Sequence, residues 1–414
     1  MPTQHSNSRL RCLLSCALLD IIHFARCIAV SHKIVLELRV ESPPIPEIAG
    51  PLKMASPDVS RYTVGWIAPL PLELAPAVAL LEEYDQKFVL GDDIGYHVGR
   101  IGNHWVVMAV CSKIGTNPAA HVLANMCRSF PNIKHVLVVG IAGAVPYYDL
   151  DLQEQIVLGD IVVGCPQSSE GGVVHYEFGA WDSKAGITRS GHTLEPSAAL
   201  QAAVNIVQSS HMKNGTRIPQ YLRDIRSCLV EDEVPEFTDP GGANDYLFSN
   251  GYPHRDCARL CSGLCDFTKA KPRSARGSRA IRQEDTPRIH YGTIGSANTL
   301  VLSSAKRDEL YKEHGIICFE MEAAGVMNSH EALVIRGISD YADSHKNKTW
   351  QKYAAAVAAA YAKEILLTLQ PEPAEERGKT WRIYFLFNWQ VHPKLISVKV
   401  SVYSKLLDGY LRIT

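Results

Sequence analysis

The chain has 414 residues, of which 46% are hydrophobic and 21% are charged, as in ordinary globular proteins that bury a large core. Its 42 basic and 43 acidic residues leave a net charge of -1, so composition indicates neither a nucleic-acid-binding nor a membrane-binding surface. The 11 cysteines form an odd count in a chain far too long to need disulfides. This favours reduced thiols and a cytoplasmic protein.

Residues 1–61 are predicted to form an N-terminal extension that ends in a linker. Arginines precede an apolar run over residues 12–30, as in a secretory signal peptide. Polar and charged residues interrupt this run, so no uninterrupted span approaches the ~20 residues that a membrane helix needs. We therefore favour a peripheral helix or a dispensable extension over a targeting segment. The proline-rich residues 41–57 predict a linker, and the folded domain is expected to begin at Tyr62.

Strand and helix patterns alternate from residue 62 to about residue 370. Strands are predicted over residues 62–68, 96–101, 104–111, 135–139, 160–163 and 332–338, and another begins at residue 289. Helices are predicted over residues 74–84, 117–130, 194–208, 303–314, 323–331 and 350–369. This alternation predicts an α/β fold with three layers, α/β/α, in which helices cover both faces of a twisted, mixed central sheet.

A glycine-containing run, Gly140 to Ala144, follows the predicted strand at 135–139. Glycines there would let the backbone approach another group closely. The run lacks the third glycine of a dinucleotide fingerprint, and no Lys-Ser/Thr pair follows as in a P-loop. A tight turn between a strand and a loop explains the pattern equally well.

Residues 209–288 interrupt the alternation and are predicted to be an insertion, partly disordered around residues 269–284, where basic residues accumulate. The basic run has no interleaved aromatic residues, which favours a solvated loop over a nucleic-acid contact. His254, Cys257, Cys261 and Cys265 could bind zinc, but the cysteines lie in one cluster rather than in two knuckles. We therefore predict no metal site.

Two acidic clusters flank the predicted strand at 332–338. Glu320 and Glu322 precede the helix before this strand, and Asp340 and Asp343 follow the strand. Carboxylates at the carboxyl end of a buried strand lie where open α/β sheets usually bind ligands. Acidic residues also favour helix starts, so solvated helix caps are the alternative.

The motifs of this chain resemble, in order, those of the nucleoside phosphorylase superfamily. They are IAPLPLE, VVGIAGA, LGDIVVG, FEMEAAG and RGISDYAD, spread over residues 62–369. The similar branch contains purine and uridine phosphorylases and methylthioadenosine/adenosylhomocysteine nucleosidases. The sequence after Ser339 is particularly similar to fungal proteins that carry this domain. The resemblance implies a nucleoside phosphorylase-like catalytic domain over residues 62–370, with residues 371–414 as a C-terminal extension.

The resemblance also implies roles for the acidic clusters. Cleavage of a purine N-glycosidic bond leaves negative charge on the base, and Asp340 would protonate the base, which requires burial to raise the pKa of this acid. Glu322 would bind ribose hydroxyls and Met321 would lie under the sugar. Arg336 and Ser339 would orient the Asp340 loop. The implied substrate-binding set is Glu320, Met321, Glu322, Ala142, Gly143, Leu300, Val301, Arg336 and Ser339.

The nucleophile distinguishes hydrolysis from phosphorolysis. Phosphorolysis needs arginines near the first loop and before the glycine run, and this chain has none there. Glu73 instead matches the acid that activates water in the nucleosidases, and its charge would repel phosphate. We therefore predict a nucleosidase that hydrolyses adenosine-type purine nucleosides. Phosphorolysis, and a module that senses nucleosides or depletes nucleotides, are the alternatives.

The same resemblance implies a small-molecule nucleoside as the binding partner and no cofactor. No nucleic acid and no membrane partner is expected. The chain is expected to form a homo-oligomer, most simply a dimer.

Overall fold

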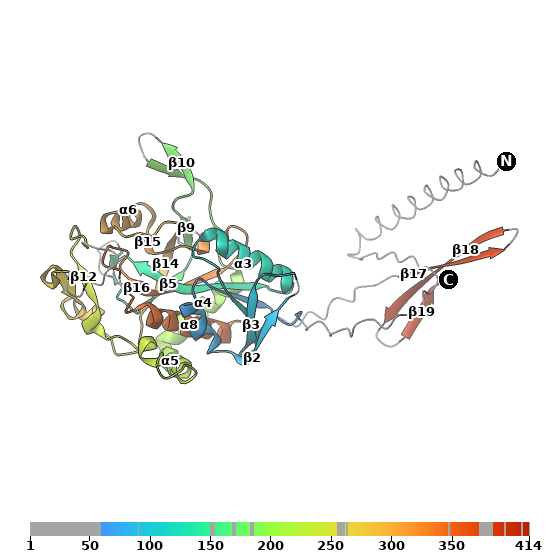
Figure 1. Ribbon diagram of the computed structural model, residues 1–414, viewed down its shortest axis with the longest axis horizontal. Helices are drawn as coiled ribbons and strands as arrows, with labels where there is room; N and C mark the ends of the chain where they lie inside the picture. The colour runs from blue at the N-terminus through green and yellow to red at the C-terminus, as the bar shows by residue number, and fades with distance from the viewer. Residues whose placement is uncertain are drawn as a thin grey trace. The chain divides into compact units, whose positions relative to one another are not determined.

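The computed structural model describes residues 59–89, 91–149, 154–167, 171–182, 186–254, 261, 264–346 and 348–371, together with three strands beyond them (Figure 1). One compact unit spans Pro57–Glu372. The peripheral helix or targeting segment predicted over residues 12–30 lies outside the described residues, as does the rest of the extension before residue 59. Among the helices that the structure describes, none combines the length and apolar character needed to cross a bilayer.

A ten-stranded mixed sheet forms the centre of this unit, in the order β15-β14-β8-β16-β5-β1-β4-β3-β2, with β9 paired to β14 (Figure 1). Its strands are β1 (Val64–Ala68), β2 (Glu82–Phe88), β3 (Gly95–Ile101), β4 (His104–Val110), β5 (His135–Ala144), β8 (Ile161–Gly164), β9 (Val173–His175), β14 (Ile289–Ser296), β15 (Ile316–Glu320) and β16 (Leu333–Asp340). The end of β5 also pairs antiparallel with β15, through Gly143 and Phe319. This additional pairing brings the glycine run of β5 beside the first acidic cluster.

Helices cover both faces of the sheet. On one side α8 (Gln351–Thr368) packs on β16 and β5, and it is covered in turn by α2 (Pro71–Val78), α4 (Ala198–Asn214) and α5 (Ile218–Ser227). On the other side lie α3 (Thr116–Ser129) and α6 (Ser304–His314) (Figure 1), and α7 (Ala323–Met327) packs against α3. Because helices enclose it, α8 is buried on nearly every side and uses alanines to fit. The predicted three-layer α/β/α fold with a mixed sheet is confirmed.

The structure corrects three predicted elements. The helix predicted over residues 74–84 ends at Val78, and Glu82–Phe88 instead forms β2, an edge strand paired with β3. Its side chains are mostly exposed, so no apolar alternation marked it as a strand. The glycine run, considered as a turn, continues β5 to Ala144. The helix predicted over 323–331 ends at Met327.

Shorter elements complete the description. They are β6 (Tyr147–Tyr148), β7 (Glu154–Gln155), β10 (Gly179–Asp182), β11 (Gly186–Arg189), β12 (Tyr246–Phe248), β13 (Ala270–Pro272) and five single-turn 3₁₀ helices between Val234 and Ala280. In the C-terminal extension, β17 (Tyr384–His392), β18 (Leu395–Leu406) and β19 (Gly409–Ile413) form an antiparallel sheet of their own.

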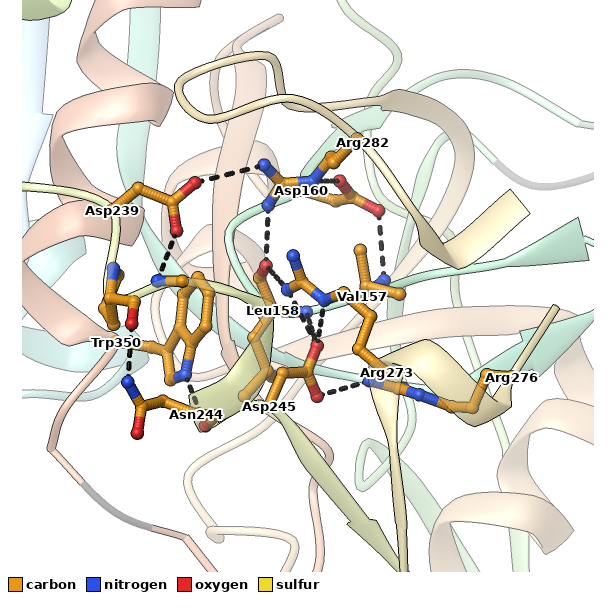
Figure 2. Close-up of polar contacts among 12 residues, drawn as sticks. Val157, Leu158, Asp160, Asp239, Asn244, Asp245, Arg273, Arg276, Arg282 and Trp350 are labelled. Carbon is orange, nitrogen blue, oxygen red and sulfur yellow. Dashed lines mark hydrogen bonds and ion pairs between the residues drawn. The ribbon is translucent and has the colours of Figure 1, made fainter. Parts of the chain in front are cut away.

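Partial disorder was predicted around residues 269–284, but the structure instead contains a buried ionic network there (Figure 2). Arg273 and Arg276 each form an ion pair with the fully buried Asp245, with N···O distances of 2.7 and 2.5 Å. Arg282 pairs with Asp160 at 3.2 Å. The prediction treated the arginines as solvated, whereas Arg273, Arg276 and Arg282 each pair with a buried carboxylate.

The Asp245 network also reaches the second acidic cluster. Tyr341, the residue after Asp340, donates a hydrogen bond of 2.8 Å to Asp245 Oδ1 and accepts one of 2.6 Å from Arg276. The segment predicted as an insertion is therefore joined to the carboxyl end of β16.

Replacing Asp245 with asparagine tests this network. Asp245→Asn leaves Arg273 and Arg276 buried without a countercharge, which is expected to lower the free energy of unfolding by about 3–5 kcal/mol. Denaturant unfolding followed by tryptophan fluorescence measures the change. Glu309→Gln is the matched control because its ion pair with Lys306 is about half exposed and contributes less than about 0.5 kcal/mol. Equal effects of the two substitutions would contradict the assigned role of Asp245.

Candidate active site

A pocket of about 250 Å³ lies at the carboxyl ends of β5 and β16, beside the end of β15. Ten of the residues predicted for the site line it: Glu73, Ala142, Gly143, Leu300, Val301, Glu320, Met321, Glu322, Ser339 and Asp340. The pocket therefore collects residues that are up to 267 positions apart in the chain, counted from Glu73 to Asp340.

Arg336 is the exception among the predicted residues, since it lies behind the pocket wall and is fully buried. Its guanidinium forms a very short ion pair with Glu320 and lies 3.5 Å from Glu322 Oε2. Burial alone lowers the pKa of Arg336, but Glu320, Glu322 and Glu73 outweigh this and raise it. Arg336 thus positions the carboxylates, whereas we predicted that it orients the Asp340 loop and contacts substrate.

The carboxylate of Glu320 is occupied by contacts within the protein. Its carboxylate accepts hydrogen bonds from the backbone N–H groups of Glu322 and Ala323, at 3.0–3.1 Å, at the entrance to α7. The ion pair with Arg336 occupies the same carboxylate. Glu320 therefore caps a helix, as the alternative held, and also lines the pocket. Its contacts are those of a positioning residue.

The carboxylate of Glu322 lines the pocket and has fewer partners within the protein than that of Glu320. Its Oε1 accepts a hydrogen bond of 3.1 Å from the backbone N–H of Gly115, at the start of α3. Burial raises the pKa of Glu322, while Arg336 opposes this rise and Glu320 adds to it. One carboxylate oxygen faces the Arg336 side, and lone pairs remain for hydroxyl donors of a ligand.

Glu73 enters the pocket from the first turn of α2. Its Oε2 accepts from the N–H of Leu70 at 2.5 Å, which caps the helix, and its Oε1 accepts from the N–H of Ile141 at 2.7 Å. Burial raises the pKa of Glu73 to about 8, although Arg336 and the two backbone donors oppose the rise. An acid with a pKa near neutrality is suited to accepting a proton from water.

Gly140 makes this arrangement of Glu73 possible. A Cβ atom at this position would lie 2.4 Å from Glu73 Oε1 and 2.6 Å from Arg336 Nη1. No side chain fits between these two groups, so the glycine run lets an acid and an arginine pack directly against the backbone of β5.

Asp340 ends β16 with both carboxylate oxygens engaged. Ser339 donates to Oδ2 at 3.0 Å, and the backbone N–H of Ala342 donates to Oδ1 at 3.0 Å. Lys346 forms an ion pair with Oδ2 at 3.1 Å, and its side chain is 28% exposed. Of the described residues that line the pocket, Lys346 alone carries a cation.

The backbone around Asp340 is tightly constrained. Ala342 has a φ of 51°, in the left-handed region that residues with a side chain rarely adopt. A Cβ on Gly143 would lie 2.4 Å from Asp340 Oδ1 and 3.0 Å from the Ala342 nitrogen. Gly143 therefore sets how closely the Asp340 loop approaches β5.

Apolar side chains form the rest of the wall. Phe319 of β15 is buried and packs edge-on against Tyr176, with ring centroids 6.0 Å apart. Ile114 and Leu300 line the mouth and are about half exposed, at 51% and 49%. An apolar slot beside an acid suits a flat heterocyclic base, which stacks on one face and bonds at its edge.

Sequence reasoning did not identify several lining residues. They are Pro69, Leu70, Ile114, Ile141, Phe319, Ala342, Lys346 and Gln351. Phe319 is the first residue of the FEMEAAG motif, so its aromatic side chain beside Glu320 could have indicated a place in the pocket. No feature of the sequence around Ile114 indicated that it lines the pocket.

The chain is similar to known proteins over about three quarters of its length. The profile of the Phosphorylase superfamily matches residues 229–369. A nucleotide-binding leucine-rich repeat (NLR)-like protein of Hyaloscypha variabilis is 35% identical over 319 residues, which are 75% of this chain and 30% of that protein. This chain therefore spans less than a third of the length of that relative.

A further relative and one solved structure match this chain over nearly their whole length. A 5′-methylthioadenosine/S-adenosylhomocysteine nucleosidase of Mycobacterium bovis is 26% identical over 321 residues, covering 75% of this chain and 97% of that protein. The solved structure of such a nucleosidase from S. pneumoniae is 20% identical, with a TM-score of 0.47 over 74% of this chain and 100% of that chain. The family profile and the nucleosidase relatives support membership of the nucleoside phosphorylase superfamily, as the motifs predicted.

Proposed function

We propose that this chain hydrolyses the N-glycosidic bond of adenosine-type purine nucleosides. The observation that carries the proposal is the meeting of Glu73, Glu322 and Asp340 in one pocket with an apolar slot. The family supports N-glycosidic cleavage in general terms, and the nucleosidase relatives support a purine nucleoside as substrate.

Each acid has a separate task in this reaction. Glu73 takes a proton from water as the water oxygen bonds to the anomeric carbon. The electron pair of the broken carbon–nitrogen bond leaves with the base, and the carboxyl group of Asp340 gives that base a proton. Glu322 accepts hydrogen bonds from the ribose hydroxyls, and its charge stabilises the positive ribose in the transition state. The products are the free base and the free sugar.

Lys346 adds a step to this scheme. Its ammonium group occupies Asp340 Oδ2, so Lys346 must be displaced and Asp340 must carry a proton before Asp340 can donate a hydrogen bond to an incoming base. As a cation in the pocket, Lys346 is also the group that would favour a phosphate nucleophile over water. Phosphorolysis is therefore the second candidate, although Glu73 would repel a phosphate dianion.

We further propose the cytoplasm as the location and a homo-oligomer, most simply a dimer, as the assembly. The cysteines that the structure describes at positions 111, 127, 165, 228, 261, 265 and 318 form no disulfide with one another, which supports a reducing compartment.

Asp340→Asn tests the reaction. The wild-type chain is incubated with adenosine, methylthioadenosine or inosine, with and without phosphate, and base and sugar products are quantified. Base and unphosphorylated sugar are expected without phosphate, and Asp340→Asn is expected to lower kcat by about 10²–10⁴-fold because it removes the acid.

Asp308→Asn is the control for this experiment, because Asp308 is 29% exposed and lies outside the pocket. A strict need for phosphate would overturn hydrolysis in favour of phosphorolysis. Absence of base release from every nucleoside would overturn the enzymatic proposal altogether.

The pH dependence of kcat/KM tests Glu73. A general base works in its ionised form, so activity is expected to rise with pH through an inflection near the Glu73 pKa of about 8. Initial rates across the range, with intrinsic fluorescence to verify folding at each pH, measure this profile. A rate that is flat or falls as the pH rises through this value would exclude Glu73 as the base.

Gly143→Ala tests the position of Asp340. The added methyl group would displace the Asp340 loop, and a misplacement of about 1 Å is expected to lower kcat by about 10²-fold. Gly95→Ala is the matched control, because a Cβ on that strand glycine meets only the exposed ring of Phe88 at 3.1 Å. Similar kcat values for both variants would show that Gly143 does not set the geometry.

A further inference from the structure

Four potential metal ligands converge near the Asp340 loop, in a place that the proposed reaction does not use. His254, Cys261, Cys265 and His345 each offer one ligand atom, and these atoms all lie within 4.8 Å of one another. His254, Cys261 and His345 are buried, with exposed fractions of 7–9%. We propose that these residues form a structural zinc site.

The distances within the cluster match a zinc site. His345 Nδ1 lies 3.7 Å from the Cys261 sulfur and 3.6 Å from the Cys265 sulfur. Zinc bonds of about 2.3 Å to sulfur and 2.0–2.1 Å to nitrogen, in a tetrahedron, separate the two ligand atoms by about 3.6 Å. The observed separations thus leave room for one ion between the ligands.

His345 is already held in the orientation that a metal ligand requires. Its Nε2 lies 2.7 Å from the carbonyl oxygen of Tyr252, so the ring proton on Nε2 is donated there. Nδ1 then carries the lone pair that faces the sulfur atoms. Metal-binding histidines typically donate their second nitrogen in this way, to a backbone carbonyl or a carboxylate.

The packing around His345 fixes the same orientation. Its ring stacks on Phe248, with centroids 3.8 Å apart and planes 12° apart, and the ring of Tyr252 lies nearly parallel to it with a centroid distance of 5.5 Å. The His345 backbone N–H donates to Asp343, and the His254 N–H donates to Ser344. Preorganised ligands lose little conformational entropy when they bind a metal.

The chemistry of the ligands selects zinc. Two sulfur and two nitrogen donors in a tetrahedral arrangement are typical of Zn²⁺, whereas Mg²⁺ and Ca²⁺ prefer oxygen ligands. Binding releases one proton from each thiol to solvent and leaves a centre with no net charge, which suits its burial. Four protein ligands leave no open position for water, so the site is structural.

A zinc ion here would connect two distant parts of the chain. Cys261 and Cys265 belong to the segment predicted as an insertion, while His345 directly precedes Lys346, the ion-pair partner of Asp340. The metal would hold this segment against the loop after β16. The sequence predicted no metal because the cysteines lie in one cluster, and the fourth ligand, His345, lies 80 residues beyond Cys265. Cys257, which we considered with the cluster, lies outside the described residues.

A cobalt titration tests the site directly. The reduced full-length chain is titrated anaerobically with Co²⁺, which reports tetrahedral thiolate coordination by intense visible bands and sulfur-to-metal charge transfer. Saturation at one equivalent is expected, with loss of the bands when Zn²⁺ is added. Absence of saturable tetrahedral bands would overturn the proposal, as would thiol counting that shows Cys261 and Cys265 joined in a disulfide after preparation under reducing conditions.

Substitutions then locate the ligands. Cys261→Ser with Cys265→Ser is expected to abolish the bands and the rise in the thermal unfolding midpoint that Zn²⁺ produces. Cys228→Ser, at an exposed cysteine outside the cluster, is the control and keeps both. Retention of the bands by the double variant would overturn the assignment. If that variant does not fold, the titration of the wild-type chain decides by itself.

Discussion

The burial of Arg336 among three carboxylates is the interaction on which the site depends. The guanidinium is fully buried on β16 and sits between acids from α2, β15 and the start of α7. Three acids in one small volume would repel one another and protonate without a central cation, and an unpaired buried arginine would be equally costly. The guanidinium therefore offsets the cost of burying the carboxylates, and the carboxylates offset the cost of burying the guanidinium.

The same cluster divides its acids between structure and chemistry. Glu320 uses its oxygens on Arg336 and on the entrance of α7, whereas Glu322 and Glu73 keep lone pairs directed toward the pocket. Close packing against Gly140 allows this division, because the backbone of β5 can approach both an acid and the arginine. Asp340 stands apart from Arg336 and is held instead by Ser339, Ala342 and Lys346.

The segment before β14 supports the other side of the pocket. Arg273 and Arg276 hold Asp245, and Asp245 holds Tyr341, so the residue after Asp340 is anchored by a network from residues 245–276. The proposed zinc ligands tie the same segment to His345. The loop between these anchors contains Ala342 in a left-handed conformation, which a surrounding structure must enforce. A segment that resembled an insertion thus contributes to the geometry of Asp340.

Sequence alone determined the main alternation of strands and helices, though not the edge strand β2, together with the three-layer fold and the motifs around Glu73, Glu322 and Asp340. These features depend on local periodicity and short motifs, which a linear sequence displays directly. Only the tertiary structure decided that Arg336 serves the carboxylates, that Lys346 pairs with Asp340, and that Arg273 and Arg276 are buried. It also decided that His345 joins His254, Cys261 and Cys265. The physical reason is that the cost of burying a charged or metal-binding side chain depends on its partners, and these partners lie far away in the chain.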